Sequence, residues 1–224
     1  MALMLRGLAA SILVLGVVGC VKPAPPPYDI PSSMVLQTQS VWSTTLGYVR
    51  PAADFTRYDS VFIEPVRLYM GGNGRFGTTP IEDRQEVGRY MQDAFARAIG
   101  EQVQLADAPG PNVLRLRIIM VGLQETNPLL AASTHFSISG MAVDISRSVL
   151  GMNGSFMGSV TYLAEFYDGQ TDTMLAAFQS QASADALDIT EDLSALGSAK
   201  VGVEKAARHM RDMLASMQHG TMQF

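Results

Sequence analysis

The sequence predicts an α+β fold with two layers, in which a mainly antiparallel sheet has two helices packed on one face. Three observations predict it: a strand-like segment followed by an amphipathic helix, a pair of alternating segments around a short turn, and a second amphipathic helix near the C-terminus. The order strand, helix, several strands, helix is typical of domains whose helices lie on one side of a sheet.

The first strand and the first helix are expected between residues 58 and 100. YDSVFIEPVRLYM (58–70) is rich in the β-branched and aromatic residues that favour strands. The loop GGNGRFG follows, and then a helix that is expected to begin with a capping box of Thr79 and Glu82, with Pro80 at its first position. Gly100 is expected to end it. The helix has an apolar stripe at helical spacing, made of Val87, Met91, Ala94, Phe95, Ala98 and Ile99.

The remaining elements follow from periodicity. NVLRLRIIMVGL (112–123) alternates at first and is then apolar on both faces, as expected of a strand well inside a sheet. Residues 159–168 and 174–182 predict a hairpin around DGQTD. A closing helix has an apolar stripe of Val203, Ala207, Met210, Leu214 and Met217.

The first twenty residues are typical of a secretory signal that ends at a lipid attachment site. Arg6 is the one charged residue before Gly19, residues 8–18 are apolar or small, and Cys20 follows at once. The apolar run is shorter than the about 20 residues that a membrane-spanning helix needs. VVGC (17–20) resembles the lipobox of bacterial lipoproteins, in which the cysteine becomes the first mature residue and carries a diacylglycerol on its sulfur and an acyl chain such as palmitate on its amine. We expect Cys20 to be the lipidated residue; the alternative is an ordinary signal with an incidental cysteine.

These observations divide the chain into three parts. Residues 1–19 are the predicted lipoprotein signal peptide. Residues 20–46 are the lipidated cysteine and a proline-rich tether, since five prolines between Lys22 and Pro31 exclude both a helix and a central strand. Residues 47–224 are predicted to form a single periplasmic α+β domain with an apolar insertion near 129–157.

Composition excludes several classes of protein. The chain has 21 acidic and 16 basic residues, a formal net charge of −5. This balance argues against binding to nucleic acid and against polybasic attachment to anionic lipid. Cys20 is the only cysteine, so the chain has no intramolecular disulfide and must be stabilised by a packed core.

The insertion at 129–157 leaves its role open. It is longer than most connections inside a compact domain, yet it is not polar enough for a solvated tail. Its apolar residues fit either a strand or a helix. It therefore either completes the core, or forms an apolar docking surface for a partner, a second copy or the membrane; a membrane-inserting hairpin is a further alternative.

The GNGRFG stretch (72–77) has the G-x-G-x-x-G spacing of dinucleotide-binding loops. In those loops the helix opens within the glycines, whereas here TTP follows the last glycine and only one βα unit is visible. We therefore expect a connecting loop and no cofactor.

The other chemistry-bearing side chains match no known constellation. His135, His209 and His219 are scattered, with no partner at metal-ligand spacing, and His209 is expected to face solvent. The acids near turns lack the calcium-loop pattern and are predicted to form turns and solvated surface. They are Asp168, Asp172, Asp185, Asp188, Glu191 and Asp192. The sequence thus predicts no catalytic, cofactor-binding or metal-binding residue.

Three stretches of the body resemble one family. They are YVRPAADFTRYDSVFIEPVRLY (48–69), APGPNVLRLRIIMVGLQETNP (108–128) and AEFYDGQTDTMLAAF (164–178), followed by the closing helix. They resemble proteobacterial lipoproteins known as domain of unknown function thirty-three thirteen, over roughly 47–218. The resemblance implies an envelope address and a fold but no activity.

The sequence therefore predicts a lipid-anchored, non-enzymatic accessory or binding module of the Gram-negative cell envelope. It is expected to be attached to the outer membrane through Cys20, to face the periplasm and to bind an envelope protein, with no nucleic acid and no cofactor. The alternatives are an enzyme that acts on an envelope substrate and a pore-forming secretion lipoprotein.

Overall fold

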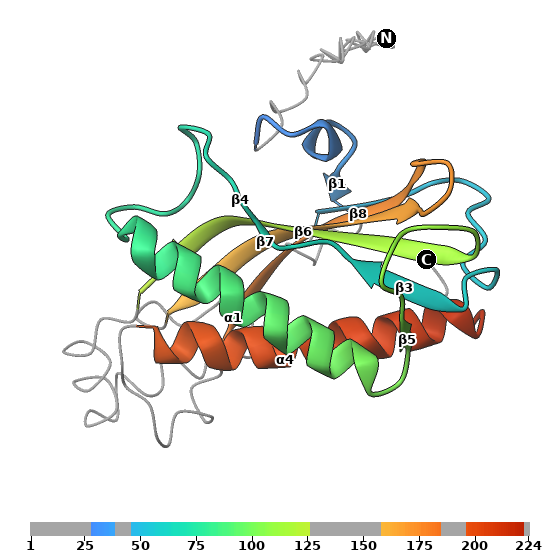
Figure 1. The fold of residues 1–224 in the computed structure, drawn as a ribbon. Helices are drawn as coiled ribbons and strands as arrows, with labels where there is room; N and C mark the ends of the chain where they lie inside the picture. The colour runs from blue at the N-terminus through green and yellow to red at the C-terminus, as the bar shows by residue number, and fades with distance from the viewer. Residues whose placement is uncertain (1–27, 39–45, 126–157, 185–195, 222–224) are drawn as a thin grey trace, which may run out of the picture.

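A computed structural model describes residues 28–38, 46–125, 158–184 and 196–221. They form two layers, a twisted sheet above a pair of helices (Figure 1). The fold class is the predicted α+β class, and both long helices lie on one face of the sheet. The signal sequence, Cys20 and the insertion near 129–157 lie outside the described residues. Among the helices within them, none is long and apolar enough to cross a membrane.

Within the described residues, the sheet has eight strands. They are β1 (Gln37–Thr38), β2 (Leu46–Val49), β3 (Ser60–Ile63), β4 (Arg67–Leu68), β5 (Gln104–Leu105), β6 (Val113–Gln124), β7 (Ser159–Asp168) and β8 (Met174–Ser183). Their order is β1-β2-β8-β7-β6-β3-β5, and β4 also pairs with β6. Along this order, all pairings from β1 to β6 are antiparallel, whereas β3, β4 and β5 are in parallel pairs, so the sheet is mixed.

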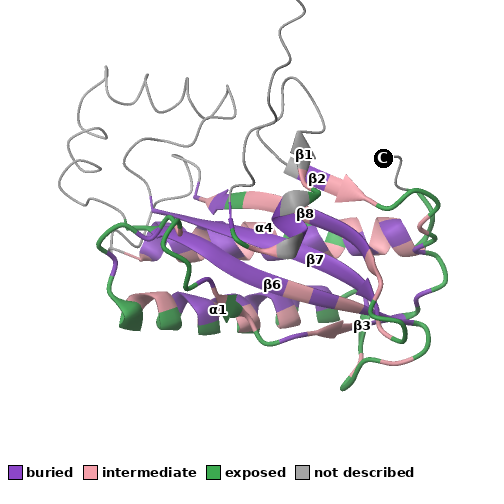
Figure 2. Ribbon diagram, turned by 90° about the horizontal axis from the view of Figure 1, so that it is seen from above, coloured by how far each residue is buried: buried purple, intermediate pink, exposed green. Residues whose placement is uncertain are grey.

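The long central strands are the ones that the sequence predicts best. Strand β6 and the β7–β8 hairpin occupy almost the predicted ranges. Every residue of β7 is buried, as are most of those in β6 (Figure 2), which explains why both strands carry apolar residues on both faces.

The first predicted strand is broken into two. Pro65 has no N–H to donate and lies between β3 and β4, which pair with successive parts of β6. The N–H of Val66 donates to Gln92 Oε1 at 2.8 Å instead of to a neighbouring strand. The chain therefore leaves the sheet at the proline and returns to it two residues later.

Helix α1 (Ile81–Gly100) begins one residue later than predicted, and the predicted capping box does not form. Pro80 is the N-cap, and no side chain caps the helix. Thr79 is buried, and its hydroxyl donates to the carbonyl of Leu123 at 3.4 Å. Packing against the end of β6 thus takes the hydroxyl away from the helix terminus. The predicted apolar stripe is buried as expected.

Helix α4 (Gly197–Gln218) lies beside α1 under the sheet, and its predicted stripe is also buried (Figure 1). The two helices are joined by a shared acid. Glu204 Oε1 accepts hydrogen bonds from the hydroxyl of Tyr90 at 2.8 Å and from Arg97 at 2.6 Å. On the sheet side, the ring of Phe95 meets Tyr162 of β7 edge to face, 5.8 Å apart.

The N-terminal segment packs on the face of the sheet opposite the helices, called here the helix-free face (Figure 1). It includes a 3₁₀ turn, η1 (Pro31–Met34), and strand β1. Tyr28 is 1% exposed and meets the ring of Tyr69 edge to face. The N–H of Asp29 donates to the Tyr69 hydroxyl at 3.0 Å. This segment falls within the range 20–46 assigned above to a tether, yet it is in contact with the body of the domain.

Helix α4 approaches β8 so closely that Gly202 has no room for a side chain. A Cβ at this position would lie 2.5 Å from the backbone nitrogen of Ser183, and backbone cannot move aside cheaply. We expect Gly202→Ala to lower the free energy of unfolding by about 1–3 kcal/mol, as overpacking does. Urea unfolding followed by far-ultraviolet circular dichroism measures this.

Gly88→Ala is the matched control, because its Cβ would meet only the end of the Leu68 side chain, at 3.2 Å. Alanine is the better helix former by about 1 kcal/mol, so this variant should be neutral or more stable. Equal losses in both variants would contradict the proposed close contact at Gly202.

Candidate functional site

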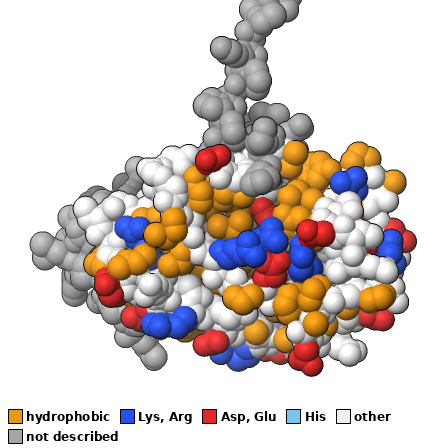
Figure 3. Space-filling model, turned by 45° about the horizontal axis from the view of Figure 1, so that its top comes forward, with side chains coloured by type: hydrophobic (Ala, Val, Ile, Leu, Met, Phe, Trp, Pro, Cys, Tyr) orange, Lys and Arg blue, Asp and Glu red, His pale blue; other side chains and the backbone are white. Residues whose placement is uncertain are grey.

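The largest group of charged side chains in the described structure lies on the helix-free face, over β3, β6 and β7. Residues at alternate positions of a strand point to the same face, and Arg115 and Arg117 of β6 stand opposite Tyr167 and Glu165 of β7. Glu64 follows β3 and joins them. Figure 3 shows basic side chains gathered around acidic ones here, between hydrophobic side chains. We call Glu64, Arg67, Arg115, Arg117, Glu165 and Tyr167 the arginine–glutamate cluster.

Glu64 is the centre of the cluster. Arg117 holds it with two hydrogen bonds, from Nε to Oε2 at 3.0 Å and from Nη2 to Oε1 at 3.1 Å. Arg67 donates to the same Oε2 at 2.7 Å, and Arg115 Nε lies 3.1 Å from Oε1. A paired fork of this kind fixes the direction of both side chains as well as their distance.

The ring of Tyr167 contacts both Arg115 and Arg117. The guanidinium carbons of Arg115 and Arg117 are each 4.8 Å from the centre of its ring, a distance typical of cation–π contact. Its hydroxyl donates to Glu165 Oε2 at 2.8 Å and accepts from Arg117 Nη1 at 3.2 Å. Arg115 also pairs with the exposed carboxylate of Asp172. The cluster therefore ties three strands to the β7–β8 turn.

The electrostatics favour the charged acid and the neutral phenol. Burial would raise the pKa of Glu64, but the hydrogen bonds and positive charge of Arg117, together with Arg67 and Arg115, hold it below its usual value. Burial and the neighbouring Glu165 raise the pKa of Tyr167. Both groups thus keep one protonation state around neutral pH, the opposite of what a general acid or base needs.

Two polar atoms of the cluster have no hydrogen-bond partner among the described residues. They are Glu165 Oε1 and Arg115 Nε, the latter near Glu64 but not aligned with it. Glu165 is 1% exposed, so its free oxygen is a buried acceptor. A buried carboxylate oxygen normally accepts a hydrogen bond, and leaving one without a partner costs free energy. The hydrogen bonds to the other oxygen of Glu165 must offset this desolvation cost.

Asp168 organises the turn at the end of β7. Its Oδ1 accepts from the N–H of Gln170 at 3.0 Å and of Thr171 at 2.7 Å, and its Oδ2 accepts from the hydroxyl of Tyr58 at 2.8 Å. Burial would raise the pKa of Asp168, but these hydrogen bonds lower it to about 2. Burial and the same contact raise the pKa of Tyr58 to about 12. Asp168 is thus the turn-forming residue that the sequence predicts.

The structure keeps the other sequence candidates apart. His209 and His219 are exposed on and after α4, as expected for His209. His135 and the acids between 185 and 192 lie outside the described residues. Within the described ranges, no three of the histidines and acids come close enough to hold a metal ion.

The glycine loop differs from a dinucleotide-binding loop in the way expected. The backbone of Arg75 within it bonds to the end of β6, donating to the carbonyl of Val121 at 2.7 Å. Gly77 has φ +53°, and helix α1 starts only after Pro80. The glycines therefore turn the chain and do not surround the helix terminus.

Two surface hollows in the described structure are the places where a substrate of an enzyme could bind. One, of about 340 Å³, lies between β4 and α1 and is lined by Val66, Leu68 and Gln92 among others. The second, of about 450 Å³, lies beside Thr79, with Arg75 and Glu125. Neither brings together two carboxylates or a serine and a histidine.

Sequence reasoning missed the arginine–glutamate cluster. One feature of the sequence could have revealed it: charged residues occur in two strands that are otherwise mostly apolar. These residues are Arg115, Arg117 and Glu165. A buried strand accepts such residues only if they meet opposite charges on neighbouring strands. The alternation of side chains along each strand could have placed these three residues on one face of the sheet. It could not have shown that Glu64 joins them.

A family model matches residues 29–210 of the chain, described as protein of unknown function (DUF3313). Among curated proteins, no sequence matches.

Several solved structures show a weak likeness to the chain. A PelC dodecamer from Paraburkholderia phytofirmans has 12% identity and a TM-score of 0.39, covering 78% of this chain and 96% of that one. A DUF330 protein from Xanthomonas campestris has 8% identity and a TM-score of 0.42, covering 77% and 92%. A DUF4136 protein from Bacteroides thetaiotaomicron has 7% identity and a TM-score of 0.38, covering 78% and 96%. At these values the likeness carries no conclusion about function.

Glu64 is predicted to stabilise the domain by neutralising the buried ends of two arginines. Glu64→Gln should lower the free energy of unfolding by about 3 kcal/mol, because removing one partner of a buried ion pair leaves an uncompensated charge. Glu101→Gln removes a carboxylate that pairs with Arg211 but is 56% exposed, and it should cost less than about 1 kcal/mol. Urea unfolding of both variants distinguishes them; a loss as small for Glu64 as for Glu101 would contradict this role.

Asp168 is predicted to make stability depend on acid pH. Its pKa is about 2 in the folded chain, below the usual 3.8, so the unfolded chain binds more protons between these values. The stabilisation is therefore complete above about pH 4 and is lost as pH falls toward 2. Unfolding measured between pH 2 and 7 should show a smaller acid-induced loss in Asp168→Asn than in the unaltered chain. Parallel pH profiles would show that the carboxylate is not responsible.

Proposed function

The chain belongs to the DUF3313 family of proteins of unknown function, and we propose that it is a lipid-anchored accessory module of the Gram-negative cell envelope that binds a protein partner without catalysing a reaction. The observation that carries the proposal is the position of Cys20, which follows a short apolar run and precedes Tyr28, the first buried residue that the structure describes, by only eight residues. A signal, an attachment point and a folded body thus follow one another directly.

Lipid attachment at Cys20 is supported by its surroundings in the sequence. Small residues precede the cysteine, as the processing peptidase of lipoproteins requires, and no other cysteine exists in the chain. The proline-rich stretch after it suits a short spacer between a membrane and a domain. Val21, rather than an aspartate, follows the cysteine, and by resemblance to enterobacterial lipoproteins this favours the outer membrane.

A non-enzymatic role is supported by the state of the charged groups. In the arginine–glutamate cluster, Glu64 is bonded to arginines and Tyr167 to Glu165. Their pKa values move away from neutrality, and so do those of Asp168 and Tyr58. Groups held in this way strengthen the sheet and are poor donors or acceptors of protons in a reaction.

Cys20→Ser is predicted to abolish anchoring. The variant should accumulate as an uncleaved or differently cleaved precursor, fail to incorporate labelled palmitate, and leave the outer-membrane fraction in a sucrose gradient. Val21→Ala is the matched control and should keep both the label and the fraction. Unchanged labelling of Cys20→Ser would refute the lipoprotein proposal.

Partner binding is tested in the same cells by crosslinking and mass spectrometry. The anchored protein should give a reproducible crosslink to an envelope protein. A Glu64→Gln variant that stays folded should keep this crosslink, and one that unfolds should lose it. Hydrolysis of an envelope substrate by the purified protein would instead support the enzyme alternative.

A further inference from the structure

The tether enters the domain at a defined point on the helix-free face. Tyr28 is fixed there by its edge-to-face contact with Tyr69, 5.5 Å between ring centres, and by the hydrogen bond from Asp29. Tyr28 lies eight positions after Cys20 in the sequence. A fully extended chain of that length spans at most about 28 Å, whatever its conformation. A lipid on Cys20 therefore keeps this point of the domain close to a membrane.

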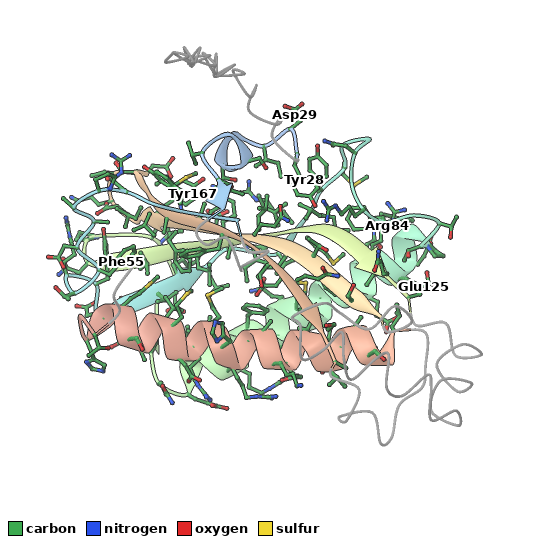
Figure 4. The ribbon with its side chains drawn as sticks, turned by 180° about the vertical axis from the view of Figure 1, so that it is seen from behind. Tyr28, Asp29, Phe55, Arg84, Glu125 and Tyr167 are labelled. Atoms are coloured by element: carbon green, nitrogen blue, oxygen red, sulfur yellow. The ribbon has the colours of Figure 1, made fainter. Side chains whose placement is uncertain are left out.

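The loop that follows β4 lies at the same point. Figures 1 and 4 show it rising on the helix-free side, next to Tyr28 and η1. Directly after β4, the N–H of Tyr69 donates to the carbonyl of Met120. The hydroxyl of Tyr69 donates to Asn73 Oδ1 at 2.6 Å, across the loop. The loop and the entry point of the tether thus share one anchor residue.

Met70 lies at the start of this loop and is 75% exposed, the most exposed large hydrophobic residue in the described structure. The others are Ile81, Leu105 and Val35, each 36–40% exposed. Val35 belongs to the N-terminal segment on the helix-free face as well. An unbranched methionine side chain adapts well to an irregular apolar environment.

Along the sequence, Met70 has an arginine on either side, Arg67 and Arg75. The side chain of Arg67 is 57% exposed although it pairs with Glu64, and Arg75 is exposed at the far side of the loop. Arg75 is near enough to Tyr28 for its charge to lower that pKa, against the larger effect of burial. The chain as a whole has a net charge of −5, so attraction to an anionic surface must come from a local group such as this one.

We propose that Met70, flanked by Arg67 and Arg75, contacts the lipid headgroup layer of the membrane that holds the anchor, so that the helix-free face is turned toward the membrane and the helices away from it. The proposal rests on the lipid anchor proposed at Cys20. The methionine enters the boundary between headgroups and acyl chains, and the arginines pair with lipid phosphates.

The test uses the mature, lipidated chain, beginning at Cys20, in vesicles of phosphatidylethanolamine and phosphatidylglycerol. Met70→Cys is labelled with a polarity-sensitive thiol fluorophore, since a lipidated Cys20 has no free thiol. Asp93→Cys, exposed on α1 in the other layer, is the matched control. Lipids brominated near the headgroup should quench the fluorophore at position 70 and not at position 93. Arg75→Gln in the Met70→Cys background should reduce the quenching.

The other outcomes are equally informative. No quenching at position 70, or equal quenching at both positions, would overturn the proposed orientation while leaving the anchor intact. Loss of quenching together with a photo-crosslink from position 70 to a protein in cells would assign the loop to a protein partner, and would also overturn it. Thiol labelling of the unaltered chain at Cys20 would show instead that the anchor itself has failed.

Discussion

Strand β6 pairs antiparallel with β7 along one edge and parallel with both β3 and β4 along the other. Its inward side chains pack on the helices, and its outward arginines form the arginine–glutamate cluster. Near the end of β6, the carbonyl of Leu123 accepts a hydrogen bond from the hydroxyl of Thr79 and so positions the start of α1. The start of α1, the cluster and the glycine loop therefore all take their places from this one strand.

The long elements could be predicted because many residues repeat one pattern. Strand β6, the β7–β8 hairpin and both helices have ten or more residues each. The short strands β1, β2 and β5 have two to four residues each, too few for a pattern. The predicted capping box is wrong for a different reason. The buried hydroxyl of Thr79 donates to the carbonyl of Leu123 on β6 and not to the backbone of its own helix.

The cluster could be predicted only in part. Arg115, Arg117 and Glu165 have strand periodicity, and their common face follows from it. Glu64 joins them because β3 and β6 pair in parallel, in a register that aligns Ile63 with Leu116. Periodicity says nothing about which distant strands become neighbours, so this contact depends on the tertiary fold.

The pairing of β2 with β8, which aligns Leu46 with Gln179, joins the first part of the domain to nearly its last strand. Contacts so distant in sequence cost much chain entropy and form slowly. In a chain synthesised from its N-terminus, β2 can pair with β1 early, but its other edge has no partner until β8 has been made. This part of the sheet is thus completed last, and until then one edge of β2 is open to chaperones or to other chains.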